Sequence, residues 1–501
     1  MRVLSEHPTV PVARRGYLDG VLLALFAVAL AIQLFVPPIV GLADNGDFSR
    51  VASPLGIFPP EELGDSAFFS WIVPQYRFDV GRIWLHGLCC YSSQTGLAIA
   101  ALPVGLAASA PGRFDLRATG LVNGLALLAA MALLLLELRP LPAPLRILGG
   151  LLLVLVFSDV SYVSFLNSFY TEPAALISLL TALALALRLA RTPDPPAWLV
   201  AGFFFASALF VTSRPQNALF GFFLAALGWR VVRYETNGRH RRRLVALAAF
   251  GLCVASVAYS RSTSPLLRRT FLFNAVFRQL LPDSPDPRRD LATLGLPPDY
   301  ARFVGVSAFS PDSPVQDENF QRVFGKVRYR TLAGFYVARP ARIRRALVRG
   351  AGEVFHVRPF GVGNFAQATG KPARTTSESF SAWSGTKARL APGRVGFVLA
   401  WGIVSLAAAI HLRWKGTTRA LRAIGEIWIA LVLVAGFQFA VPSVMTGAES
   451  RRSFLLFNAL FDLSLIALIL RVAALAGTVF ALAPRNAESR DRLALERAPS
   501  K

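Results

Sequence analysis

Two carboxylates placed three residues apart, Asp44 and Asp47, follow the first long apolar run of the chain. Asn45 and Gly46 lie between them, and this pair favours a tight turn because both residue types tolerate a positive φ. A turn can direct both carboxylates to one point, where one of them could act as a general base. Charge at a membrane–water interface is costly to desolvate and usually has a function or a partner. The alternative interpretation is a solvated cap that ends a helix.

Composition indicates the setting of this stretch. The chain has 501 residues, of which 54% are hydrophobic and only 16% charged, whereas soluble domains carry about 25% charged residues. This indicates a polytopic membrane protein. The net charge of +24 fits cytoplasmic loops rich in arginine and contact with anionic lipids. No nucleic-acid module is recognisable, so we predict no nucleic-acid partner. Cys89, Cys90 and Cys253 form neither a disulfide framework nor a metal motif.

Apolar periodicity and loop charge predict an all-α polytopic fold with about ten transmembrane helices and both termini in the cytoplasm. The basic run 239–243 is the strongest cytoplasmic marker. The predicted spans are residues 18–40, 118–136, 147–163, 174–189, 198–211, 219–232, 244–259, 395–410, 427–444 and 454–470. The apolar segment 96–110 is left out, because a span there would move the arginines of the loop after residue 136 to the outside.

The organisation follows from these spans. Residues 1–260 form an N-terminal transmembrane module that contains a first external loop, 41–117. A second large external loop covers 261–393, the three C-terminal transmembrane helices lie in 394–484, and 485–501 form a cytoplasmic tail. Interfacial helices are predicted in both loops, at residues 68–73, 96–110 and 340–357. In the last of these, Arg342, Arg345 and Arg349 share one face, which indicates a helix lying on the membrane. A soluble surface helix is the alternative there.

Four polar clusters then fall on one side of the membrane, each at an external helix end: 44–50, 167–172, 213–217 and 449–452. We predict that they converge on a site open to the outer leaflet. Asp47 is the first choice for a catalytic base, with Asp44 as its partner. The remaining candidates, all assigned to substrate binding, are Arg50, Tyr170, Glu172, Arg214, Gln216, Asn217, Glu449, Arg451 and Arg452.

Group transfer from a lipid-linked donor fits this set of side chains. A polyprenyl phosphate is an anionic leaving group, and the planar guanidinium of arginine suits phosphate. An acceptor hydroxyl would need a base. Simpler roles compete with these assignments: Arg214 could snorkel at a helix end, Glu172 could cap the helix that follows it, and Glu449 could pair only with Arg451.

The arrangement resembles the GT-C superfamily of membrane glycosyltransferases. Asp44 and Asp47 occupy the place of the family's acidic motif after helix one, although the Asp-Glu pair of the mannosyltransferases is replaced by Asp-Asn-Gly-Asp. The closer similarity is to bacterial hexose-transferase-like proteins of surface glycan synthesis. It is carried by Asn45-Gly46-Asp47-Phe48, Asn167-Ser168-Phe169-Tyr170-Thr171-Glu172, Ser213-Arg214-Pro215-Gln216-Asn217 and Leu294-Gly295-Leu296-Pro297. The resemblance implies a polyprenyl-phosphate sugar donor and inversion of the anomeric centre.

We therefore predict a glycosyltransferase of a bacterial inner membrane with its active site facing the periplasm. Its partners would be a polyprenyl-phosphate sugar, a glycan, lipid-linked or protein hydroxyl acceptor, and membrane lipids. No cofactor is predicted, although Asp44 and Asp47 could hold a divalent metal ion. A lipid-linked glycan polymerase or ligase is the first alternative. A transporter or flippase is the second, and it rests on Asp159 and Asp462, which fall inside predicted spans.

Overall fold

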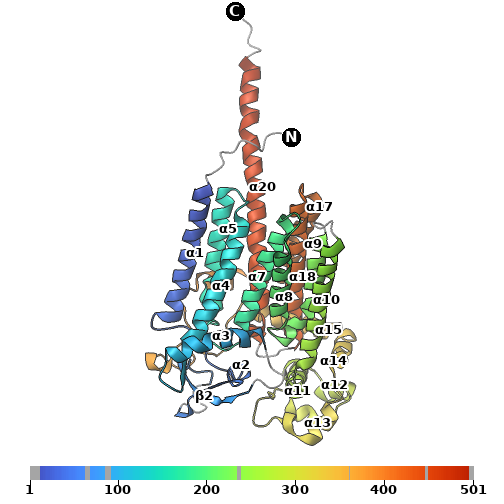
Figure 1. Ribbon diagram of the computed structural model, residues 1–501. Coiled ribbons are helices and arrows are strands. Elements are labelled where there is room, and N and C mark those ends of the chain that lie inside the picture. Colours follow the sequence, from blue (N-terminus) through green and yellow to red (C-terminus); the bar gives the residue numbers. More distant parts are fainter. Residues whose placement is uncertain are drawn as a thin grey trace, which may run out of the picture.

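The computed structural model describes residues 12–62, 68–84, 92–233, 239–359, 361–445 and 450–495. A bundle of helices forms its body, with both chain ends directed to one end of the bundle and with strands and short helices gathered at the other (Figure 1). Seven helices in the described ranges are long and apolar enough to cross a membrane. The protein is therefore a multi-pass membrane protein, and its loop-bearing end is opposite its termini. Cys89, Cys90 and Glu449 lie outside the described residues.

Every predicted span corresponds to a helix. The seven long helices are α1 (Val12–Phe35), α4 (Arg117–Leu138), α7 (Glu172–Arg191), α10 (Arg239–Ser262), α17 (Val395–Lys415), α18 (Arg419–Met445) and α20 (Leu455–Leu495). Three shorter helices stand at the other predicted spans: α5 (Ala143–Phe157), α8 (Ala197–Val211) and α9 (Phe220–Arg233). At 14 or 15 residues each, these are shorter than the ~20 residues that cross a bilayer upright.

Helix α7 is the central element of the bundle. It packs against α4, α8 and α18, and most of its side chains are buried. A helix surrounded on all sides has no polar face, which explains its long run of alanine and leucine. Its polar residues are confined to its ends, with Glu172 in the first turn and Arg188 and Arg191 in the last, as the helix dipole favours. Burial of α7 therefore fixes the position of Glu172 at the loop-bearing end.

The first external loop contains a small sheet, so the all-α prediction is wrong for this part of the chain. Strands β1 (Leu55–Phe58), β2 (Gln75–Ile83) and β3 (Arg113–Asp115) form an antiparallel sheet in the order β1-β2-β3. Its inner face supplies buried side chains such as Ile57, Tyr76 and Phe114, as expected for a sheet covered on one side. The sheet lies below the loop-bearing end of the bundle (Figure 1).

Two predicted interfacial segments of this loop differ in outcome. The apolar segment 96–110 is mostly helical and forms α3 (Ser93–Ala107), which begins at a capping box on Ser92 and lies across the lower end of the bundle (Figure 1). The segment 68–73 is not a helix. It forms a turn followed by extended chain, and Ile72 makes a parallel bridge with Ala366 of the second external loop. Its backbone thus pairs with a distant segment that local sequence does not reveal.

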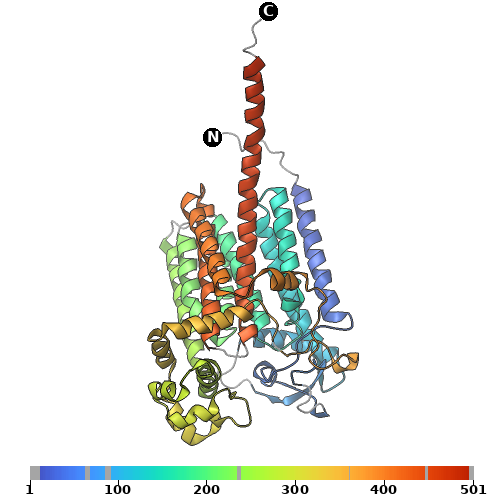
Figure 2. The same ribbon diagram turned by 180° about the vertical axis from the view of Figure 1, so that it is seen from behind.

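The second external loop folds into short helices: α11 (Pro265–Phe273), α12 (Pro287–Thr293), α13 (Glu318–Phe324), α14 (Tyr329–Val337), α15 (Pro340–Glu353) and α16 (Ala382–Leu390). Those before α15 enclose their own apolar core, in which Phe273, Phe277, Phe320 and Phe324 are in mutual contact. This lobe lies beyond the bundle end on the side away from the sheet (Figures 1 and 2).

Helix α15 lies across the end of the bundle (Figure 2) and packs on α18. Its arginine face has protein partners. Arg342 pairs with Asp290, Arg349 pairs with Asp283, and Arg345 donates to the carbonyl oxygen of Asp283 at 3.3 Å. The arginine face from which we predicted a helix lying on the membrane thus joins α15 to the lobe.

Candidate active site

The acidic stretch after α1 forms the predicted tight turn. Oδ1 of Asp44 accepts hydrogen bonds from the backbone N–H groups of Gly46 at 2.7 Å and Phe48 at 3.1 Å. Oδ1 of Asn45 accepts from the N–H of Asp47 at 3.3 Å. Gly46 has a φ of 98°, a conformation that a residue with a Cβ atom rarely adopts. The turn leads into α2 (Ser49–Ala52) and leaves the Asp47 carboxylate directed toward Arg452.

Three other chain segments deliver charged side chains to the same place. Glu172 opens α7 and is 1% exposed. Arg214 stands between α8 and the short 3₁₀ helix η2 (Pro215–Leu219), and Arg452 lies in α19 (Ser450–Ser453). Arg214 and Arg452 are each 8% exposed. The structure thus brings together residues that lie more than 400 positions apart in the sequence, at the end of the bundle from which the external loops emerge.

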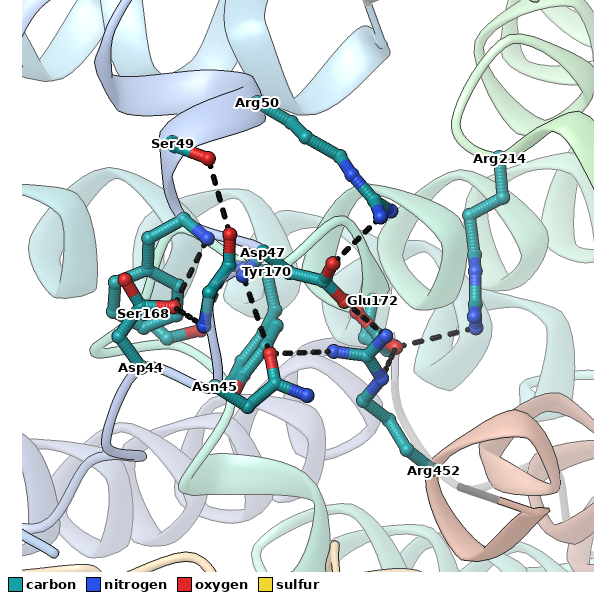
Figure 3. A network of polar contacts seen from close by, with 12 residues as sticks. Asp44, Asn45, Asp47, Ser49, Arg50, Ser168, Tyr170, Glu172, Arg214 and Arg452 are labelled. Atoms are coloured by element: carbon teal, nitrogen blue, oxygen red, sulfur yellow. Dashed lines mark hydrogen bonds and ion pairs between the residues drawn. The ribbon is translucent and has the colours of Figure 1, made fainter. Parts of the chain in front are cut away.

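Arg452 is the centre of this network (Figure 3). Its Nη2 binds Oδ2 of Asp47, its Nη1 lies 3.4 Å from Oδ1 of Asn45, and its Nε lies 3.1 Å from Oε1 of Glu172. The same Glu172 oxygen is 3.2 Å from Nη1 of Arg214. Arg50 completes the set, with its Nη2 2.8 Å from Oδ1 of Asp47. Arginine forks of this kind fix carboxylates in position.

Tyr170 forms the floor of the network. Its ring lies under the Arg452 guanidinium, with 4.8 Å between the Cζ atom and the ring centroid, a cation–π contact. Its hydroxyl donates to the carbonyl oxygen of Ala43 at 2.9 Å, and Phe48 packs edge-on against it. Tyr170 therefore links the arginine directly to the turn that carries Asp44.

The cluster combines three carboxylates with three arginines, but its two candidate bases differ. Burial raises the pKa of Asp44 to about 6, and the hydrogen bonds from Phe48 and Gly46 oppose this shift only in part. Burial acts in the same direction on Asp47, but Arg452 and Arg50 outweigh it and hold its pKa below the usual range. Asp44 can thus exchange a proton near neutral pH, whereas Asp47 stays ionised.

Neighbouring groups respond to the same environment. Burial raises the pKa of Tyr170 and of Tyr76 well above their usual value, and for Tyr76 the Asp44 carboxylate adds to the effect. Both phenols therefore stay protonated and can donate hydrogen bonds at any physiological pH. Burial lowers the pKa of Arg214, an effect that Glu172 opposes. The carboxylate of Glu172 thus compensates a guanidinium that has lost most of its hydration.

Two candidates, Arg451 and Asn217, have contacts outside the charged cluster. Arg451 pairs with Glu353 of α15. The side-chain amide of Asn217 donates to Oγ of Ser213 at 2.9 Å and accepts from Gln438 of α18 at 3.1 Å, so it joins η2 to the bundle. Gln216 is half-buried in η2, two residues from Arg214. Glu449 lies outside the described residues, so its place in the cluster stays a prediction.

An apolar groove lies on the membrane side of the cluster. Its cavity volume is about 40 Å³. Every lining residue is apolar: Leu179, Ala182, Leu183, Ala186, Phe203, Phe210, Phe220, Leu224, Leu227, Ile427, Ala430, Leu431, Val434 and Leu460. Leu179 follows Glu172 by seven residues on α7, about 10 Å along the axis at the helical rise of 1.5 Å per residue. Phe210 and Phe220 flank the Arg214 segment, so the groove begins close to the charged cluster.

The sequence did not predict the residues that hold the backbone directly before Asp44. The N–H of Ala43 donates to the carbonyl oxygen of Gly363 at 2.9 Å, and Gly41 exchanges hydrogen bonds with Asn364. More than 300 residues separate these partners, and neither has a charge or a motif. Only a pattern of backbone pairing, which is invisible in one sequence, could have identified them.

The carboxylates on which the transporter alternative rests have partners within the protein. Asp462 accepts hydrogen bonds from Nζ of Lys387 at 3.0 and 3.1 Å and from the hydroxyl of Tyr162 at 2.7 Å. Asp159 caps helix α6 (Val160–Val163) and accepts from the N–H of Ser384 at 2.8 Å. These contacts give both carboxylates structural roles.

Two carboxylates of this site, which are of a type that can bind metal ions, have arginine partners. Asp47 and Glu172 face arginines, as described above, and no group of three or more His, Cys, Asp or Glu side chains suited to a metal ion occurs among the described residues.

Comparison with known proteins gives one family. The model of the YfdI N-terminal transmembrane domain matches residues 13–488, which is almost the whole chain. No significant match is found among curated proteins. The match covers every membrane helix and all four segments of the charged cluster, and the chain therefore belongs to the YfdI N-terminal transmembrane domain family.

Proposed function

We propose that this protein is a glycosyltransferase that moves a sugar from a polyprenyl-phosphate carrier to a hydroxyl of a cell-surface glycan, a lipid-linked glycan or a protein. The observation that carries the proposal is the convergence of Asp44, Asp47, Glu172, Arg214 and Arg452 at one end of the bundle. Membership of the YfdI family supports a membrane protein of glycan metabolism. The sequence resemblance to GT-C enzymes points the same way.

The groove supports a lipid-linked donor. A polyprenyl chain is a flexible hydrocarbon, and the apolar groove between α7, α8, α9 and α18 offers one stretch of it contacts that a polar sugar nucleotide could not use. With the chain in the groove, the phosphate would reach Arg214 at the groove's charged end. Lipid chains are already in an apolar solvent, so the groove contributes shape and orientation more than hydrophobic energy.

The two acidic residues of the turn take different parts. The acceptor hydroxyl loses its proton to Asp44 as its oxygen bonds to the anomeric carbon of the sugar, and the bond from that carbon to the phosphate oxygen breaks. Asp44 suits this step because its pKa is about 6, close to the pH at which the group must both accept and release the proton. Attack opposite the leaving phosphate inverts the anomeric centre.

The arginines act on the leaving group. Arg214, Arg452 and Arg50 are the nearest cations to a phosphate at the end of the groove, and they stabilise the charge that develops there. Asp47 and Glu172 hold the guanidinium groups in place before the donor arrives. Tyr170, under the ring of contacts, fixes Arg452 relative to the Asp44 turn.

Location follows from topology under this proposal. The termini would face the cytoplasm and the cluster would face the periplasm of a bacterial inner membrane. Arginine-rich loops support this orientation: Arg139 and Arg146 lie at the terminus-bearing end, where both pair with Asp19 of α1, as the positive-inside rule expects for short cytoplasmic loops.

The test uses the purified full-length protein in lipid nanodiscs with radiolabelled polyprenyl-phosphate sugars and a panel of glycan acceptors. We expect transfer whose acidic limb lies near pH 6 and which Asp44→Asn abolishes while donor binding persists. Transfer only from a pyrophosphate-linked oligosaccharide would support a polymerase or ligase instead. Sugar transfer by Asp44→Asn at the wild-type rate would overturn the assignment of the base.

A further inference from the structure

Residues 361–390 of the second external loop connect the candidate site with the interior of the helix bundle. We call this segment the strap. Its first residues lie against the chain that precedes Asp44, and its last residues form α16, which lies against the face of the helix bundle (Figure 2). We propose that the strap is a positioning device for the Asp44 carboxylate, with Asn364 as its positioning residue and the Lys387–Asp462 pair as its remote anchor.

The contact with the site is a closed ring of backbone hydrogen bonds. The N–H of Phe69 donates to the carbonyl oxygen of Asp44 at 2.8 Å, Gly363 donates to Phe69 at 2.8 Å, and Ala43 donates to Gly363 at 2.9 Å. Three chain segments thus hold one another around Asp44. A Cβ atom on Gly363 would lie 2.1 Å from the carbonyl oxygen of Ser70, so only glycine allows this approach.

The Asn364 side chain stabilises this ring of backbone hydrogen bonds. It is fully buried. Its Nδ2 donates to the carbonyl oxygen of Gly41 at 2.6 Å, and its Oδ1 accepts from the N–H of Ser377 at 2.9 Å. The N–H of Gly41 returns a bond to the Asn364 carbonyl oxygen at 3.1 Å. The Asn364 side chain therefore connects the backbone just before Asp44 with two parts of the strap, at residues 364 and 377. It does not contact the Asp44 carboxylate itself.

The ion pair between Lys387 and Asp462 holds the far end of the strap in place. Lys387 and Asp462 are 4% and 0% exposed, and a lone charge at such a site would be strongly destabilising. Ser384 adds a bond to Asp159, and the N–H of Val160 donates to the carbonyl oxygen of Phe380 at 3.0 Å. The Lys387 side chain thus anchors α16, whose other residues are partly or fully exposed, to Asp462 of α20.

The strap fixes the backbone that directly precedes Asp44, and burial of the Asp44 carboxyl is what raises its pKa. The charged and titratable groups that face Asp44 are Asp47, Arg452, Tyr76 and Tyr170. None of them belongs to the strap. A loosened strap would therefore change the hydration of Asp44 and leave its charged neighbours in place.

The test compares Asn364→Ala and the double variant Lys387→Met with Asp462→Asn, which removes both buried charges together. Glu378→Gln is the matched control, because Glu378 belongs to the strap but its side chain is 73% exposed. Hydrogen exchange followed by mass spectrometry reports on the amides of Gly41, Ala43 and Phe69. Loss of one hydrogen bond should raise their exchange about tenfold in the two test variants, with no change in the control.

The second readout is the pH profile of sugar transfer, and this part rests on the proposed function. In both test variants the acidic limb should move to lower pH, with the melting temperature checked to exclude global unfolding. Unchanged exchange at residues 41–69 in folded Asn364→Ala would overturn the positioning role. Faster exchange in a protein that shows no sugar transfer in its wild-type form would leave the strap intact and refute the proposed function alone.

Discussion

Replacing Asp44 by Asn should stabilise the protein at neutral pH while it abolishes transfer. The amide keeps an oxygen that can accept from Gly46 and Phe48, so the turn survives, but the buried charge is removed. Folding raises the pKa of Asp44 from 3.8 to about 6. A difference of about 2 pKa units, at 1.36 kcal/mol each, makes the ionised form in the folded state costlier by about 3 kcal/mol.

The sign of this effect fixes its pH window. Between pH 3.8 and about 6 the folded protein holds a proton at Asp44 that the unfolded chain has released, so the free energy of unfolding falls as pH rises. Below this window both states are protonated and the wild type and Asp44→Asn should differ little. Above it the variant should be more stable by up to about 3 kcal/mol, an upper bound because the site is partly open to solvent.

Thermal melts of the detergent-solubilised protein at a series of pH values provide the assay. Asp47→Asn is the matched control, because we expect it to lower the stability of the folded protein at neutral pH rather than raise it. Its ion pairs with Arg50 and Arg452 stabilise the folded state at neutral pH, and that contribution is lost on acidification, so the variant should be least stable relative to wild type above pH 5. A melting temperature of Asp44→Asn that tracks the wild type at every pH would refute the reasoning about burial.

Three further outcomes are expected. Arg452→Lys should lower kcat/KM for transfer about a hundredfold, because an ammonium cannot reach Asp47 and Glu172 together; retention of most activity would exclude Arg452 from the site. Arg451→Gln should change the same constant less than about threefold, because Arg451 pairs with Glu353 outside the cluster, and a large loss would contradict that placement. Ala430→Phe narrows the groove and should raise KM for a long-chain donor, whereas Leu433→Phe, at a 51% exposed position of the same helix, should leave it unchanged; equal effects would argue against the groove as the lipid site.

The sequence carries strong information on the membrane helices and weaker information on what lies between them. Apolar runs and arginine loops locate α4 and α7 within a few residues, because crossing a bilayer constrains length and polarity together. The turn at Asn45-Gly46 is equally local and equally predictable. The positive-inside rule, from which we predicted which spans face which way, also predicts that Asp47, Glu172 and Arg452 lie on one side of the membrane.

What the sequence does not reveal depends on pairing over long distances. The strands β1 and β3 are only 4 and 3 residues long, too short for a clear alternation, and their paired residues lie between 19 and 40 positions away. The aromatic segment after residue 68 suggested an interfacial helix, but its backbone pairs with the strap. Asn364 has no charge or motif, and Lys387 is a single basic residue in a segment predicted to be a loop. Their roles arise from contacts that no local pattern encodes.

The placement of Asp44 in one cluster with three arginines has a consequence for the energy of the proposed reaction. A sugar phosphodiester carries one negative charge, and the phosphate released from it can carry two. The proton that reaches Asp44 neutralises one carboxylate at the same moment. The net charge of the enclosed region is then the same before and after transfer, and only its centre moves, from the Asp44 turn toward the arginines. The reaction therefore redistributes charge inside a low-dielectric space without creating any, and the fixed guanidinium groups are already oriented to receive it.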